Sequence, residues 1–263
     1  MKNKITTLLT AIFVVLAGCS TNSDSGTGTL EVRLHDAPAA FDEVNIFVER
    51  VEINNTTTDE GWIVVSEPNR SFNILELING EFEVLGITDL ETGFYPQFRL
   101  ILSRDNNSVV IDGEMHDLFI PSGEQTGVKI NIDAEIEEDI RYVLLLDFDA
   151  KRSVVEAGQA DPLRFLLKPV IRATNEAITG NISGTVLQVD ARPAIYAIAG
   201  SDTLSTTFAD TLTGEFKLIG LEEGMYTVSV NPQAGEYQEY QQDGVQVQVG
   251  ETTELGDIDL SSN

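Results

Sequence analysis

The chain has 263 residues, of which 43 are acidic and 16 are basic, so its formal net charge is −27. A charge of this sign repels phosphate backbones, which excludes nucleic acid as an expected partner. The sequence contains a single cysteine, Cys19. An intramolecular disulfide and a zinc site built from several thiolates are therefore excluded as well.

The first 18 residues have the pattern of a secretory signal peptide. Lys2 and Lys4 give a positive start, a short apolar run follows, and small residues precede Cys19. The apolar run is much shorter than the about 20 residues that a membrane-spanning helix needs. The ending Leu16-Ala17-Gly18-Cys19 resembles the bacterial lipobox, in which the cysteine is acylated and the chain is cut just before it. The alternative is an ordinary secretory signal with an incidental cysteine.

The lipobox resemblance implies that residues 1–18 are removed and that residues 19–29 form a polar tether carrying lipid on Cys19. Stable anchoring needs more than one acyl chain, so we expect attachment to the membrane through several N-terminal chains. Ser20 follows the cysteine in place of aspartate, which resembles the sorting pattern of outer-membrane lipoproteins. We therefore expect a lipid-anchored protein of the cell envelope, at the outer membrane.

Apolar residues alternate with polar ones from Leu30 onward, which is the pattern of half-buried β-strands. Val44, Ile46 and Val48 share one face, and the phase then changes, which predicts a bulge near Glu49-Arg50.

Two later segments give the clearest strand signals. Residues 128–136 alternate throughout, whereas residues 143–148 are almost continuously apolar and are expected to lie centrally between two layers. Residues 89–92 and 150–157 are each expected to form a short helix or turn. No long amphipathic helix is expected in the chain.

A polar stretch at residues 174–180 predicts a domain boundary, which divides the chain into residues 30–174 and 179–260. Short strands separated by turn signals favour β-sandwiches in both parts, so the predicted fold class is all-β with two β-sandwich domains, immunoglobulin-like or prealbumin-like. The strands expected in the second domain are 182–189, 194–199, 214–218, 226–230, 245–249 and 255–260.

One sequence pattern occurs in both halves. Leu90-Glu91-Thr92-Gly93-Phe94-Tyr95 matches Leu221-Glu222-Glu223-Gly224-Met225-Tyr226. A tyrosine in this position resembles the tyrosine corner of immunoglobulin-like folds, where the hydroxyl bonds to nearby backbone. We predict a structural role for Tyr95 and Tyr226, and the alternative is a ligand contact.

Residues 179–260 resemble carboxypeptidase-regulatory-like domains of the prealbumin type. The matching segments are Gly180-Asn181-Ile182-Ser183-Gly184-Thr185-Val186, Thr213-Gly214-Glu215-Phe216, Gly220-Leu221, Tyr226-Thr227-Val228 and residues 247–250. The resemblance implies a β-sandwich that serves as a spacer, a stabiliser, or an adhesion or glycan-binding module.

Residues 30–173 resemble a family of bacterial lipoprotein domains of unknown function (family 4382 type). The matching segments include His35-Asp36-Ala37-Pro38, Arg50-Val51-Glu52-Ile53, Leu146-Asp147-Phe148-Asp149-Ala150 and Leu167-Lys168-Pro169-Val170-Ile171-Arg172. This resemblance implies no catalytic residues and no mechanism.

Residues with catalytic chemistry are scarce. His35 and His116 lack a nucleophile-elbow sequence and are predicted to be ordinary polar residues. Asp147 and Asp149 point the same way on an extended strand, so they could act as paired acids or flank a cation, but we favour turn capping or pairing with nearby basic residues.

Metal sites are not predicted either. Asp133, Glu135 and Glu137 line one strand face without a loop to close over a cation, so we expect a solvated face and no specific calcium requirement. No phosphate-binding glycine-rich loop is present, and no cofactor is expected.

The sequence therefore predicts a non-catalytic, lipid-anchored protein that acts as an interaction module, with a protein or glycan partner. A carbohydrate-binding accessory lipoprotein is the first alternative, although one tryptophan and 7% aromatic residues give few sugar-stacking platforms. A hydrolase that depends on Asp147 and Asp149 is the second.

Overall fold

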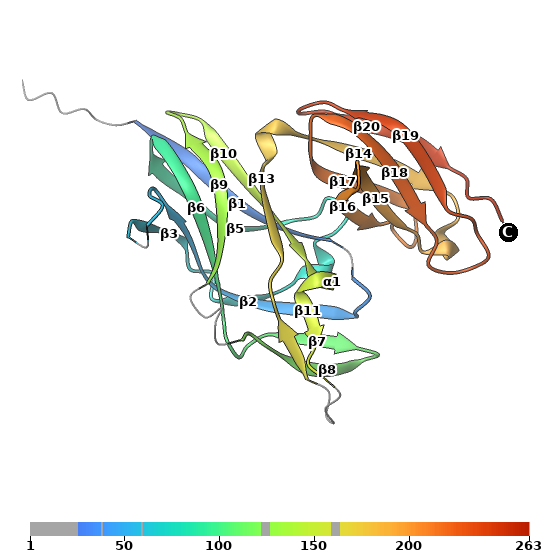
Figure 1. The fold of residues 1–263 in the computed structure, drawn as a ribbon, viewed down its shortest axis with the longest axis horizontal. Helices are drawn as coiled ribbons and strands as arrows, with labels where there is room; N and C mark the ends of the chain where they lie inside the picture. Colours follow the sequence, from blue (N-terminus) through green and yellow to red (C-terminus); the bar gives the residue numbers. More distant parts are fainter. Residues whose placement is uncertain (1–25, 38, 59, 122–126, 159–163, 263) are drawn as a thin grey trace, which may run out of the picture.

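The computed structural model describes residues 26–37, 39–58, 60–121, 127–158 and 164–262 (Figure 1). Nearly all of the regular structure in them is β-strand, so the all-β prediction is confirmed. None of the helices in these ranges is long and apolar enough to cross a membrane. The predicted lipidation residue, Cys19, lies outside the described residues.

The N-terminal sandwich consists of two sheets. One sheet has the strand order β13-β10-β1-β5, and the other has the order β11-β12-β8-β7-β2-β6-β9, with β3 and β4 also paired to β2. Its elements are β1 Thr27–Ala37, β2 Glu43–Asn54, β3 Trp62–Ser66, β4 Arg70–Asn73, η1 Ile74–Glu76, β5 Glu83–Glu91, β6 Gly93–Leu102, β7 Ser108–Ile111, β8 Glu114–Phe119, β9 Val128–Ile136, β10 Arg141–Asp149, α1 Ala150–Ser153, β11 Val154–Glu156, β12 Phe165–Leu167 and β13 Ile171–Asn175.

The C-terminal sandwich consists of a sheet with the order β17-β14-β20 and a sheet with the order β16-β15-β18-β19. A short turn of 3-10 helix, η3 Glu176–Ile178, connects it to β13. Its elements are β14 Thr179–Val186, η4 Val189–Ala191, β15 Ala194–Ala199, β16 Asp202–Phe208, β17 Glu215–Glu222, β18 Gly224–Asn231, β19 Tyr240–Val247 and β20 Thr252–Ile258.

Each sandwich has a hydrophobic core of its own, formed by alternate residues of its strands. In the first core, Leu30, Val32 and Leu34 of β1 are fully buried, as the alternation predicts. The neighbouring β10 is parallel to β1 and buries residues on both of its faces. This explains why residues 143–148 are almost continuously apolar.

Three of the predictions for local structure are confirmed. The register of β2 against β6 shifts between Val48 and Arg50, which is the predicted bulge. Residues 128–136 form β9. The hydroxyls of Tyr95 and Tyr226 donate to the carbonyl oxygens of Glu91 and Glu222, each at 2.9 Å, so both tyrosines are corners.

Three strand assignments differ from the sequence predictions. Residues 89–91 belong to β5 because they pair with the start of β1, so the helix or turn predicted at 89–92 is wrong. At 150–157 only Ala150–Ser153 is helical, and Val154–Glu156 pairs with β12. The polar strand β16 was not predicted, because the buried Ser205 and Thr207 interrupt its apolar pattern.

Candidate functional site

A bulge in β17 brings the two sandwiches into contact. Ile219 and Gly220 together oppose one residue of β14, and Gly220 has a φ of +70°. A Cβ atom at this position would lie 3.1 Å from Leu145 Cδ2 of the N-terminal sandwich. Leu145 and Ile219 are 2% and 9% exposed but belong to neither core. These two apolar side chains are therefore buried where the sandwiches meet.

Asn79, in the loop between η1 and β5, makes the second contact. Its backbone N–H donates to Thr207 Oγ1 at 3.0 Å, and its side-chain amide donates to the Glu215 carbonyl oxygen at 3.3 Å. The Lys217 backbone N–H donates to Asn79 Oδ1. Because β17 is an edge strand, the Asn79 amide occupies a position that a neighbouring strand would otherwise fill.

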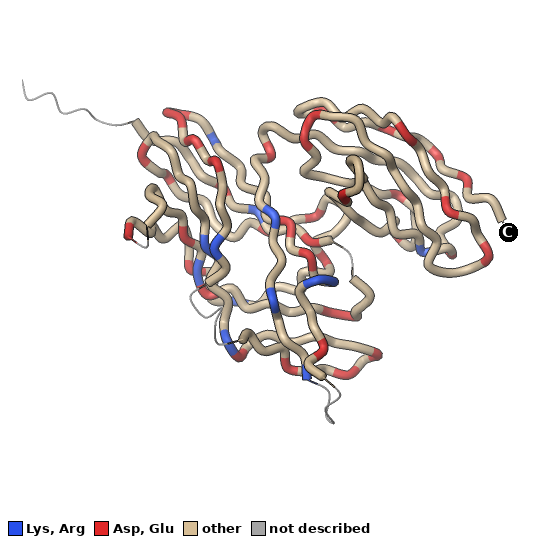
Figure 2. The backbone as a smooth tube through the Cα atoms, in the orientation of Figure 1, with Lys and Arg blue, Asp and Glu red and all other residues tan. Residues whose placement is uncertain are grey.

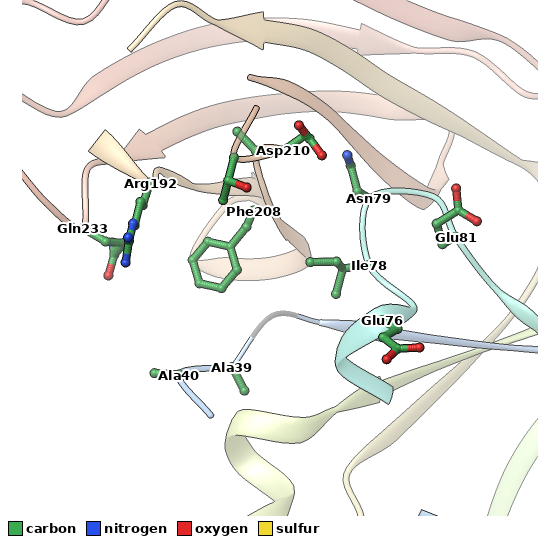
Figure 3. Close-up of a pocket in the computed structure, with 12 residues that line it drawn as sticks. Ala39, Ala40, Glu76, Ile78, Asn79, Glu81, Arg192, Phe208, Asp210 and Gln233 are labelled. Carbon is green, nitrogen blue, oxygen red and sulfur yellow. The ribbon is translucent and has the colours of Figure 1, made fainter. Parts of the chain in front are cut away.

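A cleft of about 610 Å³ opens beside this contact and is lined by loops of both sandwiches (Figure 3). Ala39, Ala40 and Ile78 come from the N-terminal sandwich, and Phe208 comes from the end of β16. Figure 3 shows the Ile78 side chain pointing towards Phe208 across the cleft. The volume lies within the range of about 300–1,000 Å³ that is usual for ligand pockets.

A second cavity of about 280 Å³ is also lined by Ala39, Ile78 and Phe208. Phe41 and Leu75 extend the apolar surface there. The two cavities share these residues and therefore adjoin one another, and we refer to them together as the groove.

The rim of the cleft is mainly acidic. Glu76, Glu81 and Asp210 line it, and Arg192 is the one basic residue among its described lining residues. Asp210 accepts the backbone N–H groups of Leu212 and Thr213, and these bonds lower the pKa of its carboxyl group.

Acidic residues also outnumber basic ones in the chain as a whole, most strongly in the C-terminal sandwich. Figure 2 shows acidic residues over both sandwiches and basic residues mostly in the N-terminal one. Residues 179–263 contain 13 acidic residues and two basic ones, Arg192 and Lys217.

A row of three ionisable residues lies close to the cleft. Strand pairing places His35 beside Asp147, and Asp147 beside Arg172. His35 Nδ1 lies 3.1 Å from the Glu81 carbonyl oxygen, and Arg172 Nη2 lies 3.5 Å from both Asp147 Oδ2 and the Gly220 carbonyl oxygen. Burial lowers the pKa of His35 and raises that of Asp147.

Asp36 lies on the opposite face of β1 and is fully buried. Its Oδ1 accepts the backbone N–H of Ala150 at 3.1 Å, and its Oδ2 has no hydrogen-bond partner among the described residues. Burial raises the pKa of Asp36 well above its usual value, and the charges of Asp147 and Asp149 act in the same direction.

The structure uses Asp147 and Asp149, the acids of the hydrolase alternative, in separate contacts. Asp147 pairs with Arg172, and Asp149 caps α1 by accepting the backbone N–H of Arg152 at 2.9 Å. Capping by Asp149 agrees with the preferred prediction, while the partner of Asp147 was not foreseen. Neither acid is among the described residues that line the cleft or the second cavity.

The other predicted polar positions are not among the described residues that line the cleft. His35 is buried in the ionisable row, and the ring of His116 lies 5.2 Å from that of Phe165. Asp133 and Glu135 are exposed on β9, and Glu137 is exposed just beyond its end. No group of three or more histidine, cysteine or acidic residues that could hold a metal ion occurs within the described part of the chain.

Among the described residues, the exposed phenylalanines are Phe82, Phe94 and Phe119, which lie on three separate segments. Trp62 is half-buried, and the Arg99 guanidinium lies over its ring at 4.1 Å.

Comparison with protein families matches residues 27–169 to the domain of unknown function DUF4382, which is just over half of the chain. The chain belongs to this family. Comparison with curated proteins finds none that matches the sequence of this DUF4382 protein.

Several solved structures resemble parts of the DUF4382 protein. A type II cohesin–X-dockerin complex from Acetivibrio cellulolyticus matches with 16% identity and a TM-score of 0.25, over 32% of this chain and 58% of that one. The Bacillus anthracis TIE protein matches with 10% identity and a TM-score of 0.22, over 90% of this chain and 34% of that one.

The major pilin T-13 of Streptococcus pyogenes matches with 9% identity and a TM-score of 0.18, over 91% of this chain and all of that one. With TM-scores this low, none of these likenesses carries a conclusion about function.

The sequence did not reveal the cleft. Its lining residues lie between positions 39 and 233, mostly in loops, where no periodic pattern marks a site. Asn79-Gly80 was the one local signal, because this dipeptide favours a left-handed turn, and both residues have positive φ here.

Proposed function

We propose that this DUF4382 protein is a lipid-anchored binding protein of the bacterial cell envelope, and that the cleft between its sandwiches is the ligand site. The observation that carries the proposal is the cleft of about 610 Å³ with an apolar floor and a polar rim, to which both sandwiches contribute. Concave, mostly apolar sites between domains with a few polar groups are typical of ligand binding.

The position of the cleft relative to the proposed anchor supports this function. β1 begins at Thr27, close to the tether, and ends at Ala37, close to the cleft residues Ala39 and Ala40. At about 3.3 Å per residue, β1 places about 33 Å between these two ends. A protein anchored through Cys19 at the outer membrane would then hold its cleft away from the lipid surface.

The anchor is tested by Cys19→Ala. If acyl chains on Cys19 hold the protein, this variant moves from the membrane fraction to the soluble fraction while the folded part keeps its thermal stability. Ser20→Ala is the matched control and should stay in the membrane fraction. Unchanged partitioning of Cys19→Ala would contradict the lipid anchor.

The cleft is tested without assuming a ligand class. A fragment panel containing cationic, neutral and anionic compounds is added to protein with labelled alanine and isoleucine methyl groups. The proposal expects shifts at Ala39, Ala40 and Ile78, and no shifts at Ile140, which is exposed on the turn between β9 and β10. If no class of fragment shifts the cleft methyl groups, the cleft is not a ligand site.

A further inference from the structure

We infer that the groove between the sandwiches binds an extended polypeptide segment that carries basic and apolar side chains. This inference rests on the proposed function and specifies the ligand class for the same site. Its first basis is shape. The cleft and the smaller cavity share Ala39, Ile78 and Phe208 and continue one another, so an elongated ligand can contact both.

The floor of the groove favours apolar side chains. Ile78, Phe208, Phe41 and Leu75 are each half-buried, so part of their apolar surface remains in contact with water. A ligand that covers these side chains removes apolar surface from water, which is the main favourable contribution in most protein associations. Contact with apolar residues along an extended peptide would supply this burial.

The charges at the groove select the polar part of the ligand. Glu76, Glu81 and Asp210 line the cleft and Asp42 lines the smaller cavity, whereas Arg192 is the single base among the described lining residues of the two. Asp42 Oδ2 accepts the Gly113 backbone N–H at 2.8 Å, and Asp210 caps its own turn. Glu76 and Glu81 are exposed, and although Glu76 Oε1 accepts the Asn73 side-chain amide at 3.1 Å, both carboxylates can meet a basic side chain.

Edge strands beside the groove suit an extended chain. β16 and β17 are both edge strands, and Phe208 is the last residue of β16. The Asn79 amide already occupies the outer edge of β17, so β16, which lines the groove through Phe208, is the edge strand that suits such a ligand. Extended peptides commonly bind along such edges through main-chain hydrogen bonds, with pockets selecting their side chains.

The test uses three short fluorescent peptides of equal length. One alternates lysine and leucine, the second replaces each lysine with glutamate, and the third replaces each leucine with serine. Fluorescence anisotropy should show the tightest binding for the lysine–leucine peptide. Its affinity should fall as the salt concentration rises, because salt screens exposed charges.

Cleft variants then locate the binding. Glu76→Gln with Glu81→Gln should weaken binding of the lysine–leucine peptide about threefold to tenfold, since each exposed ion pair contributes a modest part of the affinity. Glu135→Gln with Glu137→Gln, at the end of β9 and just beyond it, removes the same charge far from the groove and should change the affinity less than about twofold. Glu81→Lys should shift the preference towards the glutamate peptide.

The apolar floor has its own variant. Ile78→Ala should weaken binding of the lysine–leucine peptide by about tenfold, in the range expected when an apolar contact residue is truncated. Ile140→Ala, at an exposed position on the turn between β9 and β10, is the matched control. Thermal unfolding checks that both variants keep the native fold.

The outcomes separate the two proposals. Equal losses in the cleft variants and in the β9 control pair would mean that the peptide follows the overall negative charge, which overturns the inference. Fragments that bind in the cleft while all three peptides fail would refute the peptide ligand and leave the binding site standing. If neither fragments nor peptides bind, both proposals are wrong.

Discussion

His35 and Asp36 are neighbours in the sequence but lie on opposite faces of β1. Asp36 faces the core of the N-terminal sandwich, and His35 faces the row formed with Asp147 and Arg172. The sequence identifies His35-Asp36 as a polar interruption at the end of a strand. It could not place Asp147 or Arg172 beside it, because parallel pairing of β1 with β10 joins segments more than 100 residues apart.

The buried Asp36 makes stability depend on pH. Its pKa is raised above 3.8, so the folded state keeps the proton to a higher pH than the unfolded chain does. Its contribution to the free energy of unfolding is therefore complete below about pH 3.8 and is lost as the pH rises through the folded-state pKa. The side chain of Asp36→Asn cannot lose a proton, so this variant should not show the loss. Its free energy of unfolding should therefore rise relative to that of wild type as the pH rises.

Urea unfolding of wild type and Asp36→Asn across the acidic and neutral range checks this prediction. Asp147, with a raised pKa, and His35, with a lowered one, also titrate with folding, in opposite directions. The difference between the two proteins is therefore the quantity to compare at each pH. A difference that does not vary with pH would contradict a raised pKa at Asp36.

The two tyrosine corners give a second prediction for single residues. Tyr95→Phe and Tyr226→Phe each remove a hydroxyl that donates to a carbonyl oxygen at 2.9 Å. Each should lower the free energy of unfolding by about 1 kcal/mol. Tyr240→Phe is the control, because the Tyr240 hydroxyl donates only to the side chain of Gln242. This variant should lower the free energy of unfolding by less than the two corner variants do. No loss at either corner would reopen these tyrosines as ligand contacts.

At the scale of elements, the sequence predicts strands well where one face is buried and the other is in water. β9 has this pattern and its bounds were predicted from alternation alone. The pattern fails for β16, where the polar residues Ser205 and Thr207 occupy the buried face, opposite Ala197 and Ile195 of β15. The Thr207 hydroxyl also accepts the Asn79 backbone N–H from the other sandwich. Because the buried face is itself polar, the strand has no apolar alternation by which its sequence could reveal it.

The bulge in β17 can be tested by comparing two glycines. Gly220 and Gly256 have φ values of +70° and +71°, so Gly→Ala adds similar backbone strain, about 1 kcal/mol, at either position. A Cβ atom at 256 meets open space, whereas one at 220 would lie 3.1 Å from Leu145 Cδ2. Gly220→Ala should therefore lower the free energy of unfolding more than Gly256→Ala does.

Leu145→Ala should cost less in the Gly220→Ala background than in wild type, because the new methyl group has already weakened the packing of this side chain. Chemical unfolding of the four proteins gives the coupling free energy. Equal costs at the two glycines, with no coupling to Leu145, would mean that the sandwiches do not press together at the bulge.

At the scale of the whole molecule, the segment between the sandwiches is held in structure on both sides. Thr174 and Asn175 pair with β10, and Thr179 pairs with β17, so only the single turn η3 lies outside the sheets. The composition of residues 174–180 predicts a boundary but not this pairing. For the same reason the sequence could not show that the loops on either side of the boundary meet to form a cleft.

Limited proteolysis can test the boundary predicted at residues 174–180. A variant that weakens the Asn79 contact shows whether this contact controls cleavage there. We expect cleavage after Glu176 by a glutamyl endopeptidase to require loosening of the sandwiches, because η3 is short and its neighbours are paired. Asn79→Gly removes the side-chain bonds to β17 while tolerating the φ of +60° at this position. It should be cut at 174–180 faster than wild type.

Asn69→Gly is the matched control, since Asn69 also has a positive φ but its side chain bonds only to the nearby Glu67 carbonyl oxygen. Mass spectrometry of the fragments over time identifies the first cuts. Cleavage that accelerates equally in both variants would mean that the Asn79 bonds do not hold the sandwiches together. First stable fragments that end within residues 90–160 would instead contradict the boundary, because the cut would then fall inside the N-terminal core and not between two independent ones.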